Sequence, residues 1–271
     1  MIDPCGTLPA LRAVFEQTGR RGDLALIPYW MAGYPTLDES LRIMRLLARG
    51  GADLIEIGIP FSDPVADGAT IQMAAHAALE RGFRLPDLLA ALRAEPLGCP
   101  AAIMSYLNPL ESHGRERLLD EMTGAGIAGL IIPDLPPEEA GEWLAASGPQ
   151  GVSLVFLVAP TTTDERLCRI SEACDGFIYA VSLTGTTGAR RALSDELPAY
   201  LARIREMTSQ PVAVGFGISE PAHVRSLRGR AAGVVIGSRL IDAVNQGEDL
   251  SKVMHAFKEA AQQNCGEQHS C

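Results

Sequence analysis

The chain has 271 residues, with 23 lysines and arginines against 33 aspartates and glutamates, a formal net charge of −10 and 47% hydrophobic residues, which excludes an intrinsically disordered protein. No apolar run reaches the roughly 18 residues that cross a bilayer, and no basic stripe is present to hold a nucleic-acid backbone, so we expect neither a membrane nor a nucleic acid as partner. The N-terminus lacks a basic segment followed by an apolar one, which predicts no secretory signal and a cytoplasmic protein with reduced cysteines.

Short, almost continuously apolar runs recur along the chain and predict parallel strands that are buried on both faces. They lie at 24–31, 53–59, 101–106, 129–134, 153–158, 176–182, 212–217 and 233–237. Segments with an apolar period of 3.6 residues separate these runs and predict helices. They lie at 37–48, 71–81, 115–123, 137–146, 164–173, 195–208, 221–227 and 239–245. Strict alternation of eight strands and eight helices predicts an α/β fold closed into a (β/α)8 barrel.

Three further helical segments add to the barrel: 8–17 before the first strand, 86–94 as an insertion after the second strand, and 250–262 after the last barrel helix. We expect a single barrel domain over residues 1–264 and a disordered polar tail over residues 265–271. An open, doubly wound sheet is the alternative. It would need a glycine-rich phosphate loop after the first strand, and residues 32–35 contain one glycine.

Two carboxylates lie where catalytic groups of such barrels are found, at the carboxyl ends of strands and on the loops that follow them. Glu56 lies inside the second predicted strand among apolar residues, where desolvation would raise its pKa into the range useful for acid–base chemistry. Asp67 lies in the following loop. Alternatively, Glu56 is a buried acid with a structural role, and Asp67 is a turn-forming residue before Gly68. Together, Glu56 and Asp67 predict a catalytic pair.

Glycines follow the last three predicted strands and predict a phosphate site, because glycine allows close backbone approach and a helix N-terminus favours an anion. The phosphate-binding candidates are Gly188, Gly215, Phe216, Gly217, Gly237 and Ser238. Arg239, directly after Ser238, either adds a positive charge there or stays solvated.

Nucleophilic and metal chemistry find little support in the sequence. None of the 5 histidines lies at a predicted strand end, and the 6 cysteines form no CxxC motif. The tail 265–271 is expected to be a frayed terminus, and a metal site formed by its cysteines and histidine is the weaker alternative. The residues alone therefore predict a barrel enzyme that acts on a phosphorylated small molecule by acid–base chemistry, with no metal and no cofactor.

Residues 54–68, Leu-Ile-Glu-Ile-Gly-Ile-Pro-Phe-Ser-Asp-Pro-Val-Ala-Asp-Gly, resemble the signature of the α subunit of tryptophan synthase. Further motifs follow in that family's order at 28–35, 106–109, 132–136, 182–190, 215–219 and 237–238. The resemblance covers residues 8–262. It implies a carbon–carbon lyase of tryptophan biosynthesis, which cleaves indole-3-glycerol phosphate by a retro-aldol reaction to indole and D-glyceraldehyde 3-phosphate.

The resemblance also implies a partner, a β subunit that carries pyridoxal phosphate and joins indole to serine in an α2β2 heterotetramer. Pro60 and Asp63 would face that subunit, and this chain would hold no cofactor of its own. Two alternatives remain open: a stand-alone lyase that releases free indole, and a catalytically silent regulatory partner of a β subunit. Intact Glu56 and Asp67 argue against the silent partner.

Roles for single residues follow from the same resemblance. Glu56 would be the acid–base residue, and Asp67 would accept a hydrogen bond from the indole N–H. The residues implied to bind the substrate, in the indole pocket and loops, are Tyr29, Met104, Tyr106, Asn108, Asp134, Tyr179 and Thr187, of which Thr187 would also position Asp67. The sequence departs from the family pattern at Trp30, Met31, Leu183, Thr186 and Arg239. Since residues 29 and 31 face the same side of a strand, Met31 is expected to alter the pocket wall.

Overall fold

The computed structural model describes residues 10–182, 195–215 and 217–263. Several predictions concern residues outside these ranges: those for Leu183, Thr186, Thr187, Gly188, Phe216 and the tail 265–271. Within the described part, no helix is long and apolar enough to cross a membrane.

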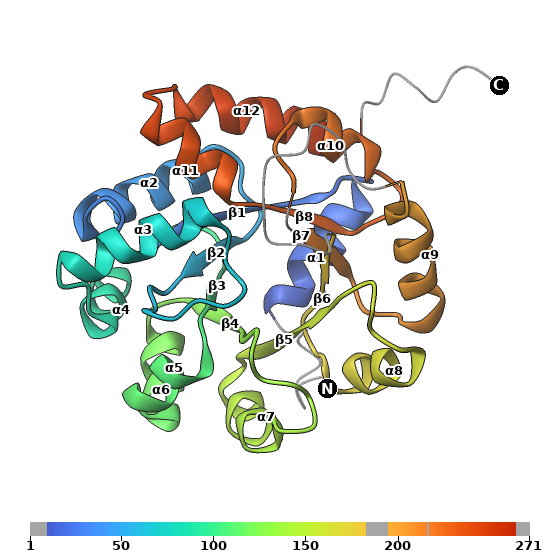
Figure 1. Ribbon diagram of the computed structural model, residues 1–271, viewed down its shortest axis with the longest axis horizontal. Coiled ribbons are helices and arrows are strands. Elements are labelled where there is room, and N and C mark those ends of the chain that lie inside the picture. The colour runs from blue at the N-terminus through green and yellow to red at the C-terminus, as the bar shows by residue number, and fades with distance from the viewer. Residues whose placement is uncertain (1–9, 183–194, 216, 264–271) are drawn as a thin grey trace.

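Eight parallel strands form a closed barrel in which each strand pairs with its neighbours along the chain and β8 pairs with β1 (Figure 1). They are β1 Ala25–Met31, β2 Ile55–Gly58, β3 Ala101–Met104, β4 Ile127–Ile131, β5 Ser153–Val158, β6 Ile178–Val181, β7 Val212–Gly215 and β8 Gly233–Ile236. Almost every strand residue is buried, as expected for apolar runs covered on both faces. The predicted (β/α)8 barrel is confirmed, although β4 ends at Ile131 rather than at residue 134.

The helices surround the barrel (Figure 1). They are α1 Ala10–Arg20, α2 Leu37–Arg49, α3 Ala69–Glu80, α4 Leu85–Ala94, α5 Leu107–His113, α6 Arg115–Gly124, α7 Gly141–Ser147, α8 Asp164–Ala173, α9 Leu197–Met207, α10 Pro221–Ser226, α11 Ser238–Asn245 and α12 Leu250–Ala261. A short 3₁₀ turn, Gly148–Gln150, follows α7. The predicted extra N-terminal helix and the insertion α4 are both present. The short helix α5 was not predicted, and the helix predicted to begin at residue 137 begins at Gly141.

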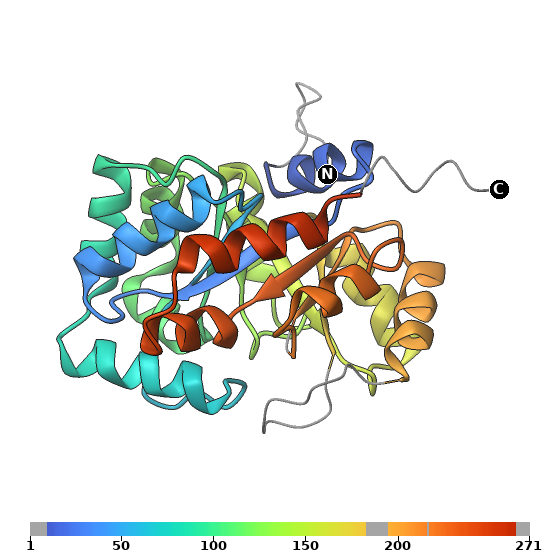
Figure 2. The ribbon, with the colours of Figure 1, turned by 90° about the horizontal axis from the view of Figure 1, so that it is seen from above.

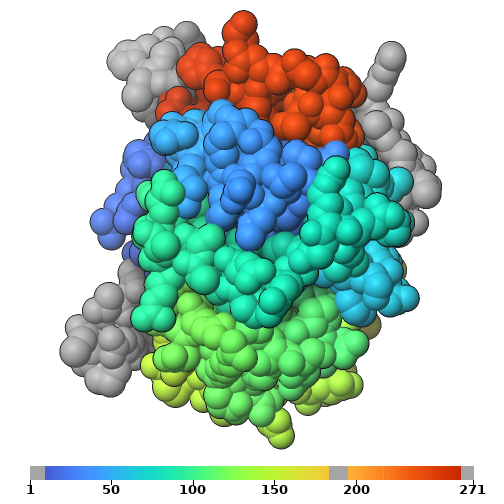
Figure 3. Space-filling view, turned by 90° about the vertical axis from the view of Figure 1, so that its left-hand side faces the viewer, coloured from blue at the N-terminus to red at the C-terminus, as the bar shows by residue number. Residues whose placement is uncertain are grey.

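Local sequence explains where α2 begins and ends. The Thr36 hydroxyl accepts a hydrogen bond from the Glu39 N–H and caps the first turn, which carries Asp38 and Glu39 against the positive end of the helix. The helix ends before Gly50. Its apolar side packs against the barrel. On the face in Figure 3, α2, α3, α4, α5 and α6 together cover the barrel wall beside α11 and α12.

Helix α1 closes the amino end of the barrel. Leu11 is fully buried, and a Cβ on Gly129 of β4 would lie 2.3 Å from its Cδ1. Phe15 lies 2.9 Å from the Cβ position of Gly233 in β8, and its ring is 5.1 Å from that of Phe177. Glycine at these strand positions therefore makes room for the α1 side chains. Figure 2 shows α1 on the side of the molecule opposite to the loop between β2 and α3.

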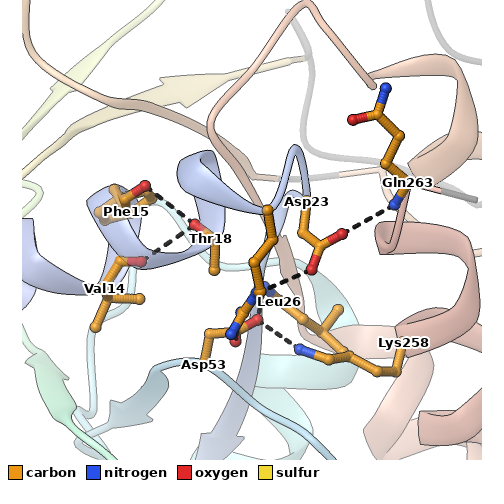
Figure 4. A network of polar contacts seen from close by, with 9 residues as sticks. Val14, Phe15, Thr18, Asp23, Leu26, Asp53, Lys258 and Gln263 are labelled. Carbon is orange, nitrogen blue, oxygen red and sulfur yellow. Dashed lines mark hydrogen bonds and ion pairs between the residues drawn. The ribbon is translucent and has the colours of Figure 1, made fainter. Parts of the chain in front are cut away.

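A polar joint connects the first and last parts of the chain at the same end (Figure 4). The Asp53 carboxylate, just before β2, accepts hydrogen bonds from the Leu26 N–H at 2.9 Å and from Lys258 Nζ of α12 at 2.8 Å. The Asp23 carboxylate accepts one from the Gln263 N–H at 2.9 Å. These contacts hold α12 against the entrance to β1.

Candidate active site

Glu56 lies in the middle of β2, in register with Tyr29 of β1 and Ala102 of β3. Its side chain is fully buried, and neither carboxylate oxygen has a hydrogen-bond partner among the described residues. An ionised carboxylate is unfavourable in such a place because nothing replaces its hydration. Burial first, and then the charge of Asp67, raise the pKa of Glu56 to about 8. Glu56 is therefore an acid that holds its proton at neutral pH.

Asp67 lies in the β2–α3 loop, residues 59–68, and its residue is 9% exposed. Burial raises the pKa of Asp67 to about 6, and the nearby Tyr106 hydroxyl partly opposes that rise. Between roughly these two pKa values Glu56 is protonated while Asp67 is ionised. The geometry thus places a proton donor and a carboxylate in one buried region, and their catalytic roles stay a prediction.

Two tyrosines complete this region. The hydroxyl of Tyr29 lies over Gly58 of β2, because a Cβ there would be 2.0 Å from that oxygen. Tyr179 of β6 lies over Gly215 of β7 in the same way, at 2.3 Å. Burial and the nearby carboxylates, among them Glu56, raise the pKa of both tyrosines well above the usual value, so both stay neutral. The structure therefore brings Tyr29, Tyr179 and the two acids together.

The other predicted substrate-binding residues lie at the ends of β3 and β4. Met104 ends β3, is 8% exposed and pairs with Gly58 and Ile131 in register. Asn108 and Asp134 are exposed. Asn108 lies in the first turn of α5, and the Asp134 carboxylate accepts a hydrogen bond at 2.9 Å from the N–H of Leu107, the first residue of that helix. Asn108 and Asp134 thus lie at the rim, outside the buried group.

Of the predicted phosphate candidates that the structure describes, Gly215 ends β7, and Gly217, Gly237 and Ser238 follow β7 and β8. Gly217 has a φ of +77°, which favours glycine. Gly237 caps α11 without a side-chain hydrogen bond, and Ser238 is the first helical residue. Such a helix N-terminus can receive an anion. Arg239, the next residue of α11, forms two hydrogen bonds with the Glu248 carboxylate, at 2.7 and 3.1 Å, and its side chain stays 27% exposed. Whether its charge contributes to a phosphate site stays a prediction.

In the described ranges, no group of three or more histidine, cysteine or acidic side chains could hold a metal ion. Of the residues expected to face a partner, Pro60 is buried, whereas Asp63 is exposed and accepts a hydrogen bond from the Ser62 hydroxyl at 2.5 Å.

Comparison with known proteins assigns the chain to a family. The sequence model described as "Tryptophan synthase alpha chain" matches residues 15–269. The chain belongs to the tryptophan synthase α chain family. The tryptophan synthase alpha chain of Roseiflexus sp. (strain RS-1) is 52% identical over 228 residues, 83% of this chain and 87% of the relative. That of Roseiflexus castenholzii is 50% identical over 245 residues, 89% of this chain and 94% of the relative.

Solved structures of tryptophan synthases have the same fold as this chain. A Mycobacterium tuberculosis tryptophan synthase structure superimposes with a TM-score of 0.89 at 37% identity, covering 95% of this chain and 100% of that chain. The tryptophan synthase alpha chain of Legionella pneumophila gives a TM-score of 0.85 at 30% identity, covering 96% of this chain and 100% of that chain.

Two departures from the family pattern lie on β1. Trp30 is fully buried, and its Nε1 donates a hydrogen bond to the Tyr34 carbonyl at 2.9 Å. The Met31 sulfur lies 4.0 Å from the Tyr29 hydroxyl, which confirms that residues 29 and 31 share a side of the strand. Met31 thus adds a thioether beside the tyrosine.

Sequence reasoning missed how neighbouring residues hold the site. Gly58 was seen as part of a motif but not as the space for the Tyr29 hydroxyl. Two further residues were not predicted: Phe61 of the same loop, whose ring lies 5.2 Å from that of Tyr106, and Gln72, whose Nε2 donates a hydrogen bond to the Asp67 carbonyl at 2.8 Å. In the sequence, the only feature that could have indicated this role of Gly58 was its position two residues after Glu56 on the same strand.

Proposed function

We propose that the chain is the lyase subunit that cleaves indole-3-glycerol phosphate to indole and D-glyceraldehyde 3-phosphate in tryptophan biosynthesis. The observation that carries this proposal is the buried Glu56 carboxyl group, which has no hydrogen-bond partner among the described residues and lies near the buried Asp67. Burial raises the pKa of Glu56 to about 8 and that of Asp67 to about 6. A retro-aldol cleavage of this substrate needs both a proton donor for the ring and an anion for the charge that the ring then acquires.

The proton of Glu56 would pass to C3 of the indole ring, which turns the ring into a leaving group with positive charge on its nitrogen. The Asp67 carboxylate would accept a hydrogen bond from the ring N–H and stabilise that charge. Glu56, now ionised, would take the proton of the glycerol hydroxyl adjacent to C3. The bond between C3 and the glycerol chain breaks, its electron pair returns to the ring, and a carbonyl forms. Glu56 ends protonated, as it began.

Binding of the two halves of the substrate would be divided around this pair. Tyr29, Met104 and Tyr179 provide apolar surface for the indole ring, with Tyr106, Asn108, Asp134 and Thr187 as the remaining proposed contacts. The proposed phosphate site consists of the backbone at Gly188, Gly215, Phe216, Gly217, Gly237 and Ser238. Support for it comes from the N-terminus of α11, where the N-cap residue Gly237 provides no side-chain hydrogen bond, and from the positive φ at Gly217.

We further propose a β subunit as partner, in an α2β2 assembly in the cytoplasm, with pyridoxal phosphate on the β subunit and no cofactor on this chain. Residues 1–264 would form one domain. The partner contact would lie on the β2–α3 loop at Pro60 and Asp63, of which Asp63 is exposed, as is Val65 of the same loop at 79%.

The test is indole release from indole-3-glycerol phosphate by the purified chain, with and without a β subunit. Glu56→Gln keeps the shape of the side chain but cannot transfer a proton, so we expect the rate to fall by about 10² to 10⁴-fold. Glycerol 3-phosphate binding, measured by calorimetry, should persist because its proposed site lies on other strands.

Glu206→Gln, an exposed residue of α9, is the matched control and should leave the rate unchanged. A Glu56→Gln protein with more than a tenth of the original rate would contradict the role of Glu56. A high rate that a β subunit does not change would identify a stand-alone lyase instead.

A further inference from the structure

The first turn of α3 follows directly on the loop that carries Asp67, and its own sequence holds it only weakly. Gly68 is the N-cap of α3 and provides no side-chain hydrogen bond, and the first turn contains no acidic residue. A polar N-cap side chain and acidic residues in the first turn are what usually stabilise the start of a helix. Contacts from outside the helix must therefore hold this turn.

Helix α11 supplies such contacts. The Thr70 hydroxyl of α3 donates a hydrogen bond to the Asp242 carboxylate of α11 at 3.2 Å. At the start of α11, a Cβ on Gly237 would lie 3.6 Å from Cδ1 of Ile71, which is ordinary van der Waals contact. Figure 1 shows α3 beside α11. Asp242 thus brings to the first turn of α3 the negative charge that its own sequence lacks.

Helix α11 is itself fixed in the fold. Leu240 and Ile241, which precede Asp242, are fully buried. Near the end of the helix, the Tyr34 hydroxyl donates a hydrogen bond to Asn245 Oδ1 at 2.6 Å. Asp242 is therefore presented by a rigid element, and Thr70 belongs to the turn that this element holds in place.

The same turn of α3 reaches the Asp67 loop through Gln72. Its Nε2 donates a hydrogen bond to the Asp67 carbonyl at 2.8 Å. From the β3 side, the Tyr106 hydroxyl accepts a hydrogen bond from the Ala66 N–H at 2.8 Å. These two contacts hold the backbone on either side of Asp67. Where Asp67 lies therefore depends on where the first turn of α3 lies.

We propose that Asp242 and Thr70 are positioning residues, which fix the first turn of α3 on α11 and thereby hold Asp67 at the carboxyl end of the barrel. The proposal rests on the proposed function, in which Asp67 stabilises charge on the indole ring and the N-terminus of α11 binds phosphate. Helix α11 then serves both halves of the site, one through its N-terminus and the other through α3.

The first experiment compares kcat for indole release with the dissociation constant of glycerol 3-phosphate, measured by calorimetry. Thr70→Val removes the hydroxyl at nearly equal volume, and we expect kcat to fall about three- to tenfold, a typical effect of one hydrogen bond. The dissociation constant should change by less than about twofold, because α11 keeps its place. Thr70→Ser retains the hydroxyl and should keep most of the rate.

Thr123→Val is the matched control for the loss of a hydroxyl. The Thr123 hydroxyl donates to the Leu119 carbonyl of its own helix, α6, at 2.9 Å, so its loss should leave kcat unchanged. A loss of rate in Thr70→Ser as large as that in Thr70→Val would overturn the proposal. An equal loss of glycerol 3-phosphate binding would overturn it as well, because the substitution would then act on α11 itself.

A double-mutant cycle tests whether the two side chains act together. Asp242→Ala should lower kcat to a similar extent as Thr70→Val. In the Asp242→Ala protein, the further change Thr70→Val should have no effect, since its partner is already gone. Losses that add in the double variant would show that the two residues act separately, and the proposal would fail.

Hydrogen exchange of the backbone amides of residues 66–72 gives a measurement that is independent of catalysis. We expect exchange there to be about three- to tenfold faster in Thr70→Val and in Asp242→Ala, with the amides of β1 unchanged. Equal exchange in the original protein and in both variants would overturn the proposal. If the original protein releases no indole, the proposed function fails, and hydrogen exchange still decides the role of this pair.

Discussion

At the scale of one residue, Glu56 is a carboxyl group that the fold buries without a hydrogen-bond partner among the described residues. Its pKa in the folded protein, about 8, lies above the ordinary value of 4.5, so the folded state holds a proton that the unfolded chain releases. Stability changes with pH according to the protons bound in each state. The folded state binds more of them between these two values. The free energy of unfolding should therefore fall as the pH rises from about 4.5 to about 8.

Glu56→Gln removes this dependence. Glutamine has the same shape and no charge, so we expect the two proteins to unfold at similar urea concentrations near pH 4.5. At pH 8.5 the variant should be more stable by an amount on the order of a few kcal/mol. Urea unfolding across this pH range measures the difference, and Glu206→Gln serves as the exposed control. A gap between the two proteins that does not change with pH would show that Glu56 is not held neutral by the fold.

At the scale of the element, α1 contributes through two side chains, Leu11 and Phe15, that occupy the amino end of the barrel. Leu11 is fully buried against Gly129 of β4. A smaller side chain there would leave a cavity that the closed barrel cannot fill by collapse, because its strands are held on both sides. The helix is thus part of the barrel core although it lies outside the ring.

Leu11→Ala should lower the free energy of unfolding by about 2 to 5 kcal/mol. Gln17→Ala, an exposed position on the same helix, should change it by less than about 0.5 kcal/mol. Urea unfolding followed by circular dichroism gives both values. Equal stability of Leu11→Ala and the original protein would mean that α1 does not belong to the cooperative unit.

The eight strands were predictable because parallel strands buried on both faces appear as apolar runs. The short helix α5 was not, since its seven residues contain Pro109 and show no helical period. The helix expected from residue 137 begins later because a turn follows Pro136 and Pro137. In the site, Glu56 was predictable as one charged residue in an apolar run. The contacts of Tyr106 were not, because they depend on the path of a loop in space.

At the scale of the whole molecule, the joint at Asp53 ties the last helix to the first two strands (Figure 4). The side chains of Lys258 and Asp53 are 19% and 13% exposed, so their contact is largely shielded from water. A charged hydrogen bond of this kind contributes more than an exposed pair. It connects segments that are far apart in the sequence and so favours the closed barrel over partly open states.

Lys258→Met keeps the apolar stem of the side chain and removes its charge. We expect a loss of about 1 to 3 kcal/mol in the free energy of unfolding. Lys252→Met is the control on the same helix, where the pair with Asp249 spans 4.0 Å and is exposed, and should change stability by at most about 1 kcal/mol. Equal effects of the two substitutions in thermal or urea unfolding would remove the special role of the joint.

The closure of the amino end by α1 also sets the route of small molecules. The interior of such a barrel is filled with side chains, and its other end is covered by Leu11 and Phe15. A molecule that reaches the buried acids must therefore pass the carboxyl ends of the strands both when it enters and when it leaves. In the proposed reaction the phosphorylated product and the free indole leave through the opening by which the substrate came in. A subunit seated on that rim stands directly in the path of the departing indole.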